Sequence, residues 1–410
     1  MAPRLPLEGI RVADLSWIIA GPYGTYLLAR MGAEVIKIEG LEPMEHIRDN
    51  PPHADNVRGP NRSGFFNTLN AAKKSVTLQL RDPEQGRMAK EIIAQSDVVI
   101  EAFSYGTIDK LGFGYEELRR IKQDIIMLSC SGFGRTGRDR TLRAFMGTVH
   151  AYTGLNSVNG HVGGPPKPAG GTWADYVTGI SIVFATLAAL RHRHKTGCGQ
   201  YIDLSMADVV LSTMGAPFME YFMNGRVGQT HGNTSATGAP NNVYRCKGDD
   251  AWVAISVETD AQWDALCAVV ADDDLRTAAY RTPDGRRKHA EAIDARISAW
   301  AKTRTPLEAT DALQRAGVPS GPSSSAADLL AQPQLRARGF FVAPEHPETG
   351  RRAIPNLPWR LASSADTPCA PAPLLGQHNQ EVLSGLLGRS QKTIDRINAK
   401  RDEIVREHSE

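Results

Sequence analysis

Apolar and polar residues in the first 130 positions alternate in the way that a series of strands and helices requires. Short runs rich in Val and Ile predict strands at 11–16, 34–39, 74–80, 97–103 and 125–130, and the stretches between them predict helices at 22–31, 83–95 and 115–122. Strands that alternate with helices form parallel sheets, because each return to the sheet needs a crossover connection. The pattern therefore predicts an α/β fold with a large, open, mostly parallel, Rossmann-like sheet and helices on both faces.

Residues 40–69 interrupt this alternation. They lack periodicity and are rich in Pro, Asn and charged residues. Long segments without regular structure are often functional. We therefore expect a long surface excursion here.

The stretch from Gly171 to Met206 has the clearest helical pattern of the chain. A run without formal charge, 176–190, follows Asp175 and ends in the basic residues 191–195. Acid at the start and base at the end are favourable to the helix dipole. The uncharged run is too short, and too rich in Ser, Thr and Gly, for a membrane span, so we predict a helix buried in a large core. A short strand at 201–204 should follow Gly197 and Gly199.

The second half of the chain predicts a smaller α/β domain. The pattern favours a helix at 207–224, a mobile loop at 228–244, a strand at 252–257, a helix at 260–270 capped by Asp260, helices at 287–301 and 306–316, and a C-terminal helix from Gln391. The length of 410 residues suits two domains. We place the large domain at 1–222, and the linker with the small domain at 223–339.

Composition excludes several classes of protein. Basic and acidic residues nearly balance, 47 against 45, which disfavours a nucleic-acid partner. The five cysteines are scattered and show no CxxC spacing, so we expect reduced thiols and no zinc site. The N-terminal sequence MAPRLPLEGIRVADLS has no apolar signal core. The sequence thus predicts a cytoplasmic protein without a membrane partner.

Asp175 is the first candidate for chemistry, and it has two interpretations. An Asp in front of a helix is commonly a cap, whose carboxylate accepts hydrogen bonds from the first amides. A carboxylate held at a helix N-terminus in a dry pocket can also be a nucleophile toward an activated acyl group. Local physics does not separate the two.

The sequence around Asp175 resembles one enzyme family. WADYVTGISIVFATLAALRHRHKTGCGQYIDLSMADVVL is similar to the central segment of the class III CoA-transferases, the family of formyl-CoA transferase and the carnitine CoA-transferases, with ungapped spacing from Asp175 to 194–197 and 199–200. The phrases DLSWIIAGPYGTYLLARMGAEVIKIE, KKSVTLQLRDPEQG, DVVIEAFSYGTIDKLGFGYEELR and LSCSGFGRTG resemble the same family, and the resemblance runs from about residue 9 to 387. It implies that Asp175 is the catalytic nucleophile.

The resemblance also implies where coenzyme A binds. Carried over position by position, the family's CoA contacts fall on Ile19, Ala20, Leu78, Gln79, Leu80, Arg81, Ala102, Phe103, Ser104, Lys110, Arg143 and Phe145. The cations among them suit the phosphates of CoA, although each alone is better explained as a solvated surface base. The segment AGPYG lacks GxGxxG spacing, so no dinucleotide site is expected.

Two regions on the substrate side depart from the relatives. The related α-methylacyl-CoA racemases carry an acid/base histidine where Phe145 aligns, and phenylalanine transfers no proton. His150 is displaced by five residues and reads as a core or surface imidazole. Formyl-CoA transferase has a tyrosine and a glutamate at the positions of Phe145 and Met146, so the acyl pocket here should be more apolar. The family's glycine-rich substrate loop is reduced to Gly238 followed by Ala239 and Pro240, which argues against formyl or oxalyl specificity.

The function that this resemblance implies is exchange of CoA between an acyl-CoA thioester and a small free carboxylic acid, through an aspartyl anhydride and an aspartyl-CoA thioester. Coenzyme A is then a substrate, and no permanently bound cofactor or metal is needed. The resemblance further implies an interlocked homodimer, in which residues 340–410 return to complete the large domain. The alternatives are an α-methylacyl-CoA racemase and a non-catalytic CoA-binding paralogue.

Overall fold

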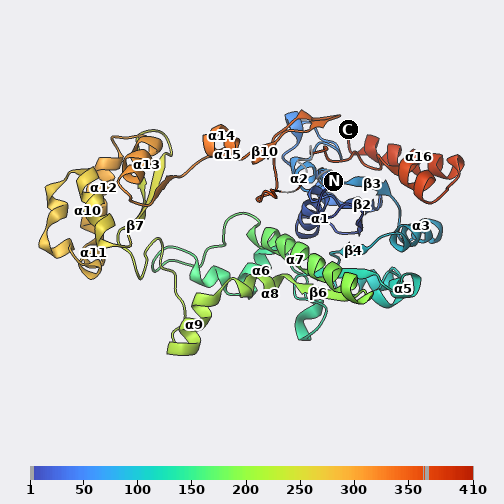
Figure 1. Ribbon diagram of the computed structural model, residues 1–410, viewed down its shortest axis with the longest axis horizontal. Helices are drawn as coiled ribbons and strands as arrows, with labels where there is room; N and C mark the ends of the chain where they lie inside the picture. The colour runs from blue at the N-terminus through green and yellow to red at the C-terminus, as the bar shows by residue number, and fades with distance from the viewer. Residues whose placement is uncertain (1–3, 363, 365–368, 410) are drawn as a thin grey trace. The chain divides into compact units, whose positions relative to one another are not determined.

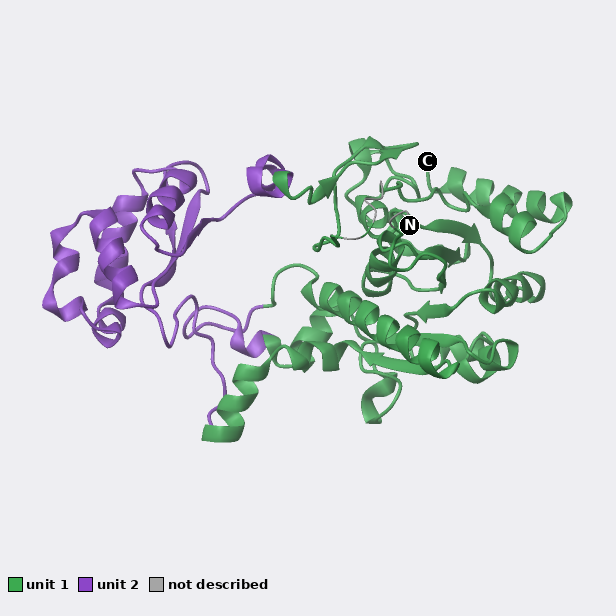
Figure 2. Cartoon of the chain, in the orientation of Figure 1, with its two compact units in different colours: residues 1–155, 168–224, 337–410 green, residues 156–167, 225–336 purple. Residues whose placement is uncertain are grey.

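The computed structural model describes residues 4–362, 364 and 369–409. The chain forms two compact units (Figure 2). Unit 1 comprises 1–155, 168–224 and 337–410, and unit 2 comprises 156–167 and 225–336. The chain therefore leaves unit 1 and later returns to it. The small excursion at 156–167 joins unit 2, which no sequence pattern indicated.

Unit 1 is built on a parallel sheet. Within the described residues it has six strands in the order β3-β2-β1-β4-β5-β6, and every neighbouring pair is parallel. The strands are β1 (Arg11–Asp14), β2 (Glu34–Glu39), β3 (Lys74–Thr77), β4 (Val98–Glu101), β5 (Ile126–Ser131) and β6 (Tyr201–Ser205). The predicted parallel α/β sheet is confirmed. The order reverses direction between β1 and β4, where the loops that follow these strands diverge to opposite faces.

Helices cover both faces of this sheet (Figure 1). Val98 and Ile100 of β4 face one apolar cluster with α1 and α7, and Val99 faces the other with α3, α5 and α16. The helices of unit 1 are α1 (Ala20–Arg30), α2 (Gly64–Leu69), α3 (Pro83–Ala94), α4 (Thr107–Lys110), α5 (Tyr115–Ile121), α6 (Met146–Tyr152), α7 (Trp173–Thr196), α8 (Met206–Ser212), α9 (Gly215–Asn224) and α16 (Gln391–Glu407), with a π-helix at Gln380–Leu386. The predicted helix at 207–224 is two helices, α8 and α9.

Unit 2 packs helices against an antiparallel sheet of β7 (Asn241–Arg245), β8 (Trp252–Ser256) and β9 (Ser320–Pro322). Its helices are α10 (Asp260–Val270), α11 (Pro283–Lys288), α12 (Ala290–Ala301), α13 (Pro306–Arg315) and α14 (Ala326–Ala331), and α15 (Pro333–Ala337) leads back to unit 1. Short strands follow at β10 (Phe341–Val342), β11 (Glu345–His346), β12 (Gly350–Arg351) and β13 (Ile354–Pro355).

Three local predictions in unit 2 are wrong. The cap of α10 is Thr259, whose side chain accepts from the N–H of Gln262, and Asp260 lies in the first turn. The helix predicted from 287 begins at Ala290, because a separate helix ends at Lys288. The end of the predicted mobile loop is strand β7.

The prediction of a surface excursion at 40–69 is correct only in part, since residues 42–43, 51–52 and 55–58 are exposed but others are not. Glu45, Arg48 and Phe66 are buried. Nε of Arg48 lies 2.6 Å from Oε2 of Glu39, which is equally buried. Buried charges that pair with one another leave no periodic pattern in the sequence, so the composition suggested solvent where the structure has a polar core.

Helix α7 is longer than the uncharged run from which it was predicted, and only one of its faces is buried. By length and composition it is the one described helix that could cross a membrane. Its stripe of Ala174, Thr178, Ile182 and related residues packs on α1 and β5 as in a core helix. The opposite face, with Phe184, is exposed. The prediction of full burial is therefore corrected.

Candidate active site

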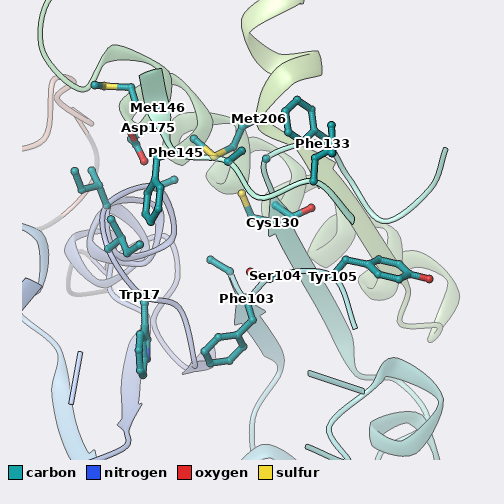
Figure 3. Close-up of a pocket in the computed structure, with 18 of the residues that line it drawn as sticks. Trp17, Phe103, Ser104, Tyr105, Cys130, Phe133, Phe145, Met146, Asp175 and Met206 are labelled. Carbon is teal, nitrogen blue, oxygen red and sulfur yellow. The ribbon is translucent and has the colours of Figure 1, made fainter. Parts of the chain in front are cut away.

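A cavity of about 320 Å³ lies wholly within unit 1, at the carboxyl ends of the parallel strands (Figure 3). Its lining comes from the segments that end or follow β1, β4, β5 and β6, namely 17–20, 102–105, 130–133 and Met206. This is the place where the strand order reverses, and open α/β sheets bind their ligands there. Asp175 and the segment 144–147 close the cavity.

Asp175 lies in the first turn of α7 and is 8% exposed. The residue before this helix is Thr172, so Asp175 does not occupy the N-cap position. The backbone N–H groups of Asp175 itself and of Ala20, the first residue of α1, favour the ionised form of this carboxylate. Asp175 thus lies at the N-termini of two helices, both of which favour a negative charge.

Two glycines explain why the helices bring these groups together. A Cβ on Gly179 would lie 3.0 Å from the carbonyl oxygen of Ala20 and 2.6 Å from Cδ1 of Tyr23. A Cβ on Gly24 would lie 2.9 Å from Cγ2 of Ile182. Since glycine has no Cβ, α1 and α7 approach closely at this point. Asp175 is one turn before Gly179, and Ala20 is one turn before Gly24, so the close contact places the carboxylate at the start of α1.

Burial raises the pKa of Asp175 to about 6, against the lowering influence of the two backbone amides. At neutral pH the side chain is therefore mainly ionised, and it is more basic than an ordinary carboxylate. Such a group combines the charge and the basicity that nucleophilic attack on an acyl carbon requires.

The other candidate nucleophiles in the cavity are less suitable. The thiol of Cys130 is buried, and burial raises its pKa, so it stays protonated. Ser104 and Ser131 also line the cavity. Within the described residues, however, the lining includes no histidine or lysine that could activate a hydroxyl.

One wall of the cavity is apolar, as predicted. Phe145 and Met146 lie beside Asp175, and Trp17 and Phe103 form a second aromatic group (Figure 3). The rings of Trp17 and Phe103 pack edge to face with centroids 5.8 Å apart. Phe145 directly precedes α6 and is 67% exposed, so the wall opens to the outside.

His150 is fully buried on α6 and does not line the cavity. Burial lowers the pKa of its imidazole. It packs near Trp173, with ring centroids 6.5 Å apart. His150 is therefore a neutral core side chain, one of the two interpretations that the sequence left open.

The structure brings only part of the predicted CoA set to the cavity. Those that line it together with Asp175 are Ile19, Ala20, Ala102, Phe103, Ser104 and Phe145. The side chain of Leu78 is fully buried in the core, Leu80 packs against that core, and Gln79 is half-buried. The predicted cations Arg81, Lys110 and Arg143 are exposed and lie outside the lining. They come after β3, β4 and β5 in the chain.

Sequence reasoning missed Arg140, which does line the cavity. Its Nη1 donates to the carbonyl of Gly137 at 2.8 Å, and its guanidinium lies 5.1 Å from the ring centre of Tyr105. The run from Arg135 to Arg143 is rich in arginine, and this signal could have pointed to the segment though not to the residue.

Gly238, Ala239 and Pro240 lie in unit 2 and do not belong to the cavity lining. All three are buried. The carbonyl of Ala239 accepts from Nε of Arg286 at 2.9 Å, and a Cβ on Gly238 would lie 2.6 Å from the carbonyl of Val257. This part of the predicted loop is thus anchored in the core of unit 2. In the described part of the chain, no group of three His, Cys, Asp or Glu residues could hold a metal ion.

Comparison with known proteins identifies relatives over nearly the whole chain. The model of CoA-transferase family III matches residues 7–379. The chain is 31% identical to the succinyl-CoA–D-citramalate CoA-transferase of Chloroflexus aurantiacus, over 97% of this chain and 98% of that protein. It is 32% identical to a formyl-CoA:oxalate CoA-transferase of Rhodopseudomonas palustris, over 95% of this chain and 96% of that protein.

A solved structure has the same fold. The crystal structure of a CAIB/BAIF family protein from Brucella suis covers 93% of this chain, and all of that chain is matched, with a TM-score of 0.85 and 28% sequence identity. The likeness therefore includes both units and the segment that returns from unit 2 to unit 1.

Proposed function

Because the chain belongs to CoA-transferase family III and is an acyl-CoA:carboxylate CoA-transferase, we propose that Asp175 is its nucleophile. The observation that carries this assignment is the buried carboxylate in the cavity at the strand-order reversal, at the N-terminus of α7 and with a pKa of about 6. No other ionised acid lines the cavity within the described residues.

The proposed reaction starts with attack of an Asp175 oxygen on the thioester carbon of the donor. The C–S bond breaks, which leaves a mixed anhydride and the CoA thiolate. The thiolate then attacks the Asp175 carbonyl and expels the donor acid as its carboxylate, and an aspartyl-CoA thioester results. An acceptor carboxylate attacks this thioester and releases the thiolate again. The thiolate attacks the acyl carbon of the acceptor, which yields the new acyl-CoA and the free Asp175 carboxylate.

The cavity supports a binding mode in which only the thiol end of CoA enters. A volume of about 320 Å³ is at the small end of ligand pockets. We infer that Ile19, Ala20, Ala102, Phe103 and Ser104 contact this end. The phosphates of CoA would then lie outside the cavity. There they would pair with the exposed side chains of Arg81, Lys110 and Arg143. The contacts of Leu78, Gln79 and Leu80 would be made by backbone groups.

The acyl group that the cavity suits is larger than a formyl group. The relatives named above act on succinyl, citramalate, formyl or oxalate groups by their names. Here Phe145 and Met146 give the nucleophile an apolar neighbour. We infer an acid with an apolar portion that packs against these two side chains. Gly238, Ala239 and Pro240 remain a proposed substrate segment.

We also propose that the protein acts as an interlocked homodimer in the cytoplasm and needs no permanently bound cofactor. Exposed apolar side chains on two helices of unit 1 support a subunit interface, namely Ile180, Phe184 and Leu187 on α7, and Met219, Tyr221, Phe222 and Met223 on α9. The chain returns to unit 1 after residue 336. Interlocking requires this connectivity, in which the small domain, 223–339, lies between two parts of the large domain, 1–222 and 340–410.

One alternative is an α-methylacyl-CoA racemase, which would also use Asp175. It needs a second acid or base opposite Asp175. The described lining residues include no histidine, no lysine and no carboxylic acid besides Asp175. Incubation with a panel of acyl-CoAs and acids separates the candidates by CoA exchange, by loss of an α-proton to deuterium, or by binding alone.

The assignment of Asp175 is tested by trapping. Enzyme treated with acyl-CoA and then with hydroxylamine should carry a hydroxamate on the peptide that contains Asp175, and Asp175→Ala should abolish both the label and the exchange. Asp208→Ala is the matched control, because Asp208 has the same first-turn position in α8 but is exposed. Label on another peptide, or full exchange by Asp175→Ala, would show that the nucleophile is a different group.

A further inference from the structure

The loop that carries Ala20 to Asp175 contains a residue in an unusual conformation. Ile18 has a φ of +72°. A β-branched residue seldom adopts this left-handed region, because its Cβ crowds the neighbouring carbonyl. The N–H of Ile18 donates to Oε1 of Glu45 at 2.8 Å. Surrounding structure must therefore hold this loop in place.

Glu45 is fully buried and is itself anchored. Its Oε2 lies 2.7 Å from Nζ of Lys37, which is also fully buried. The same Nζ donates to the carbonyl oxygen of Ser16 at 2.8 Å. The pair thus binds the backbone on both sides of Trp17, at Ser16 and at Ile18.

A second buried ion pair holds the ends of the loop. Asp14 accepts from the N–H of Ser16 at 2.9 Å and lies 3.1 Å from Nζ of Lys73. Nζ of Lys73 also donates to the carbonyl of Pro22, in the first turn of α1, at 2.9 Å. The start of the loop, its left-handed residue and the first turn of α1 are therefore fixed by charges that have no contact with the cavity.

We propose that Glu45, held by Lys37, is a positioning residue that keeps Ile18 left-handed and so holds the start of α1, with Ala20, against the first turns of α7 beside Asp175. The inference rests on the proposed role of Asp175. It assigns to the segment between β2 and α2 a part in the chemistry, although none of its side chains reaches the acyl group. A purely structural ion pair would stabilise the fold and leave the acidity of Asp175 unchanged.

The acidity of Asp175 is the readout that separates the two roles. The N–H of Ala20 favours the ionised form, so its loss raises the pKa of Asp175. The titratable side chains around Asp175 are Tyr23 of α1, His150 of α6, Cys130 of β5 and Tyr176 of α7. The tyrosines and the thiol stay protonated below pH 9, since burial raises their pKa values. His150 lies outside the cavity lining.

The test compares Glu45→Gln with Glu42→Gln in the full-length protein, by CoA exchange from pH 5 to 9 and by thermal unfolding. Glu42 is an exposed carboxylate of the same segment, 2.8 Å from Lys400, so it controls for loss of a charge there. We expect Glu45→Gln to lower kcat about tenfold at pH 7.5, to change the KM for acyl-CoA less than about threefold, and to move the acid limb up by about half a pH unit. Glu45→Asp should recover part of the loss, and Glu42→Gln should match the wild type.

A wild-type acid limb and kcat in Glu45→Gln, with only a lower melting temperature, would overturn the proposal. If Glu45→Gln does not fold, the double variant Glu45→Gln with Ile18→Gly tests the same loop, because glycine adopts the left-handed conformation without strain. It should fold with an acid limb and kcat close to those of the wild type, and a folded double variant whose limb or kcat stays displaced would overturn the proposal.

Hydroxylamine trapping of the wild type keeps the two hypotheses apart. Label on Asp175 together with an unaffected Glu45→Gln variant rejects the positioning role alone. Label on a different residue rejects the nucleophile assignment and the positioning role with it.

Discussion

Asp175 combines two properties that burial and hydrogen bonding set against each other. Removal from water makes its carboxylate more basic, and the backbone amides of Asp175 and Ala20 lower its pKa again in part. A sequence shows that an acid precedes an apolar run. It shows neither how deeply the acid is buried nor which other helix begins beside it. The identity of the candidate could be predicted from the sequence, whereas its acidity depends on α1.

The first prediction concerns pH. The nucleophile must be ionised, so kcat/KM for CoA exchange should be level above about pH 7 and should fall about tenfold per unit well below pH 6, where Asp175 becomes protonated. A series of initial rates in buffers from pH 4.5 to 8.5 measures this. A profile that stays level down to pH 4.5 would contradict the assigned acidity.

The second prediction concerns stability. The folded pKa of Asp175, about 6, exceeds the unfolded value of 3.8, so the group stabilises the fold below pH 3.8 relative to higher pH, and this contribution is lost as pH rises through 6. At pH 8 the buried charge costs about 3 kcal/mol. Asp175→Asn should therefore unfold at higher denaturant concentration than the wild type at pH 8, with the advantage gone near pH 4. Equal or lower stability at pH 8 would refute this.

The arginines show where residue-level prediction reaches its limit. Arg140 lines the cavity and Arg143 does not, although both lie in one short arginine-rich run. Which of them faces inward depends on the turn after β5 and on the start of α6, and no periodicity of the sequence specifies either.

Helices α1 and α7 are the elements on which the geometry of the site depends. Gly179→Ala would place a methyl group 3.0 Å from the backbone oxygen of Ala20, and backbone cannot move aside as a side chain can. We expect a destabilisation of about 1–3 kcal/mol and at least about tenfold lower kcat, because α7 shifts and Asp175 leaves the amide of Ala20.

Gly215→Ala is the control for this third prediction, since a Cβ on Gly215 meets nothing within 4 Å. Both variants are compared by CoA exchange and by urea unfolding. Wild-type rates in Gly179→Ala would mean that the close approach of the two helices has no role in placing the nucleophile.

Element-level prediction succeeded where local pattern alone decides structure. The strand at 34–39 was predicted with its observed ends, because Val and Ile runs bounded by turns are characteristic of buried parallel strands. Pattern did not predict the buried part of 40–69, because its charged side chains pair with partners such as Glu39 and Lys37 that only the fold brings near. The break between α8 and α9 was missed as well, although Gly215 and Pro217 soon after Thr213 are residues that mark such a break.

At the scale of the whole molecule, the sequence predicted a parallel sheet but not the order of its strands. The same alternation of strands and helices is compatible with many strand orders in the sheet. The strand order decides which loops lie next to one another. Here β1 and β4 are neighbours, so the loops that follow them form one cavity. The family resemblance supplied what periodicity did not, namely that Ala20 and Ala102 belong to one site.

The fourth prediction concerns assembly. Phe184 and Phe222 are 76% and 75% exposed, on helices that carry further exposed apolar side chains. Phe184→Asp with Phe222→Asp should weaken self-association at least about tenfold, because two apolar anchors become charged. Light scattering coupled to size exclusion gives the mass at several concentrations. Ile121→Asp, on α5, is an exposed apolar control, and an equal loss there would argue against an interface on α7 and α9.

The discontinuity of unit 1 also affects how the chain is made. Ile394 and Ile397 of α16 belong to the same apolar cluster as Val99 and Ile92, which are synthesised far earlier. The part of this apolar cluster that α16 covers therefore stays exposed until residues 391–407 have been synthesised, while unit 2 has its own core complete before then. A chain that ends before residue 391 would leave that part of the cluster exposed, and we expect it to be recognised by chaperones and degraded.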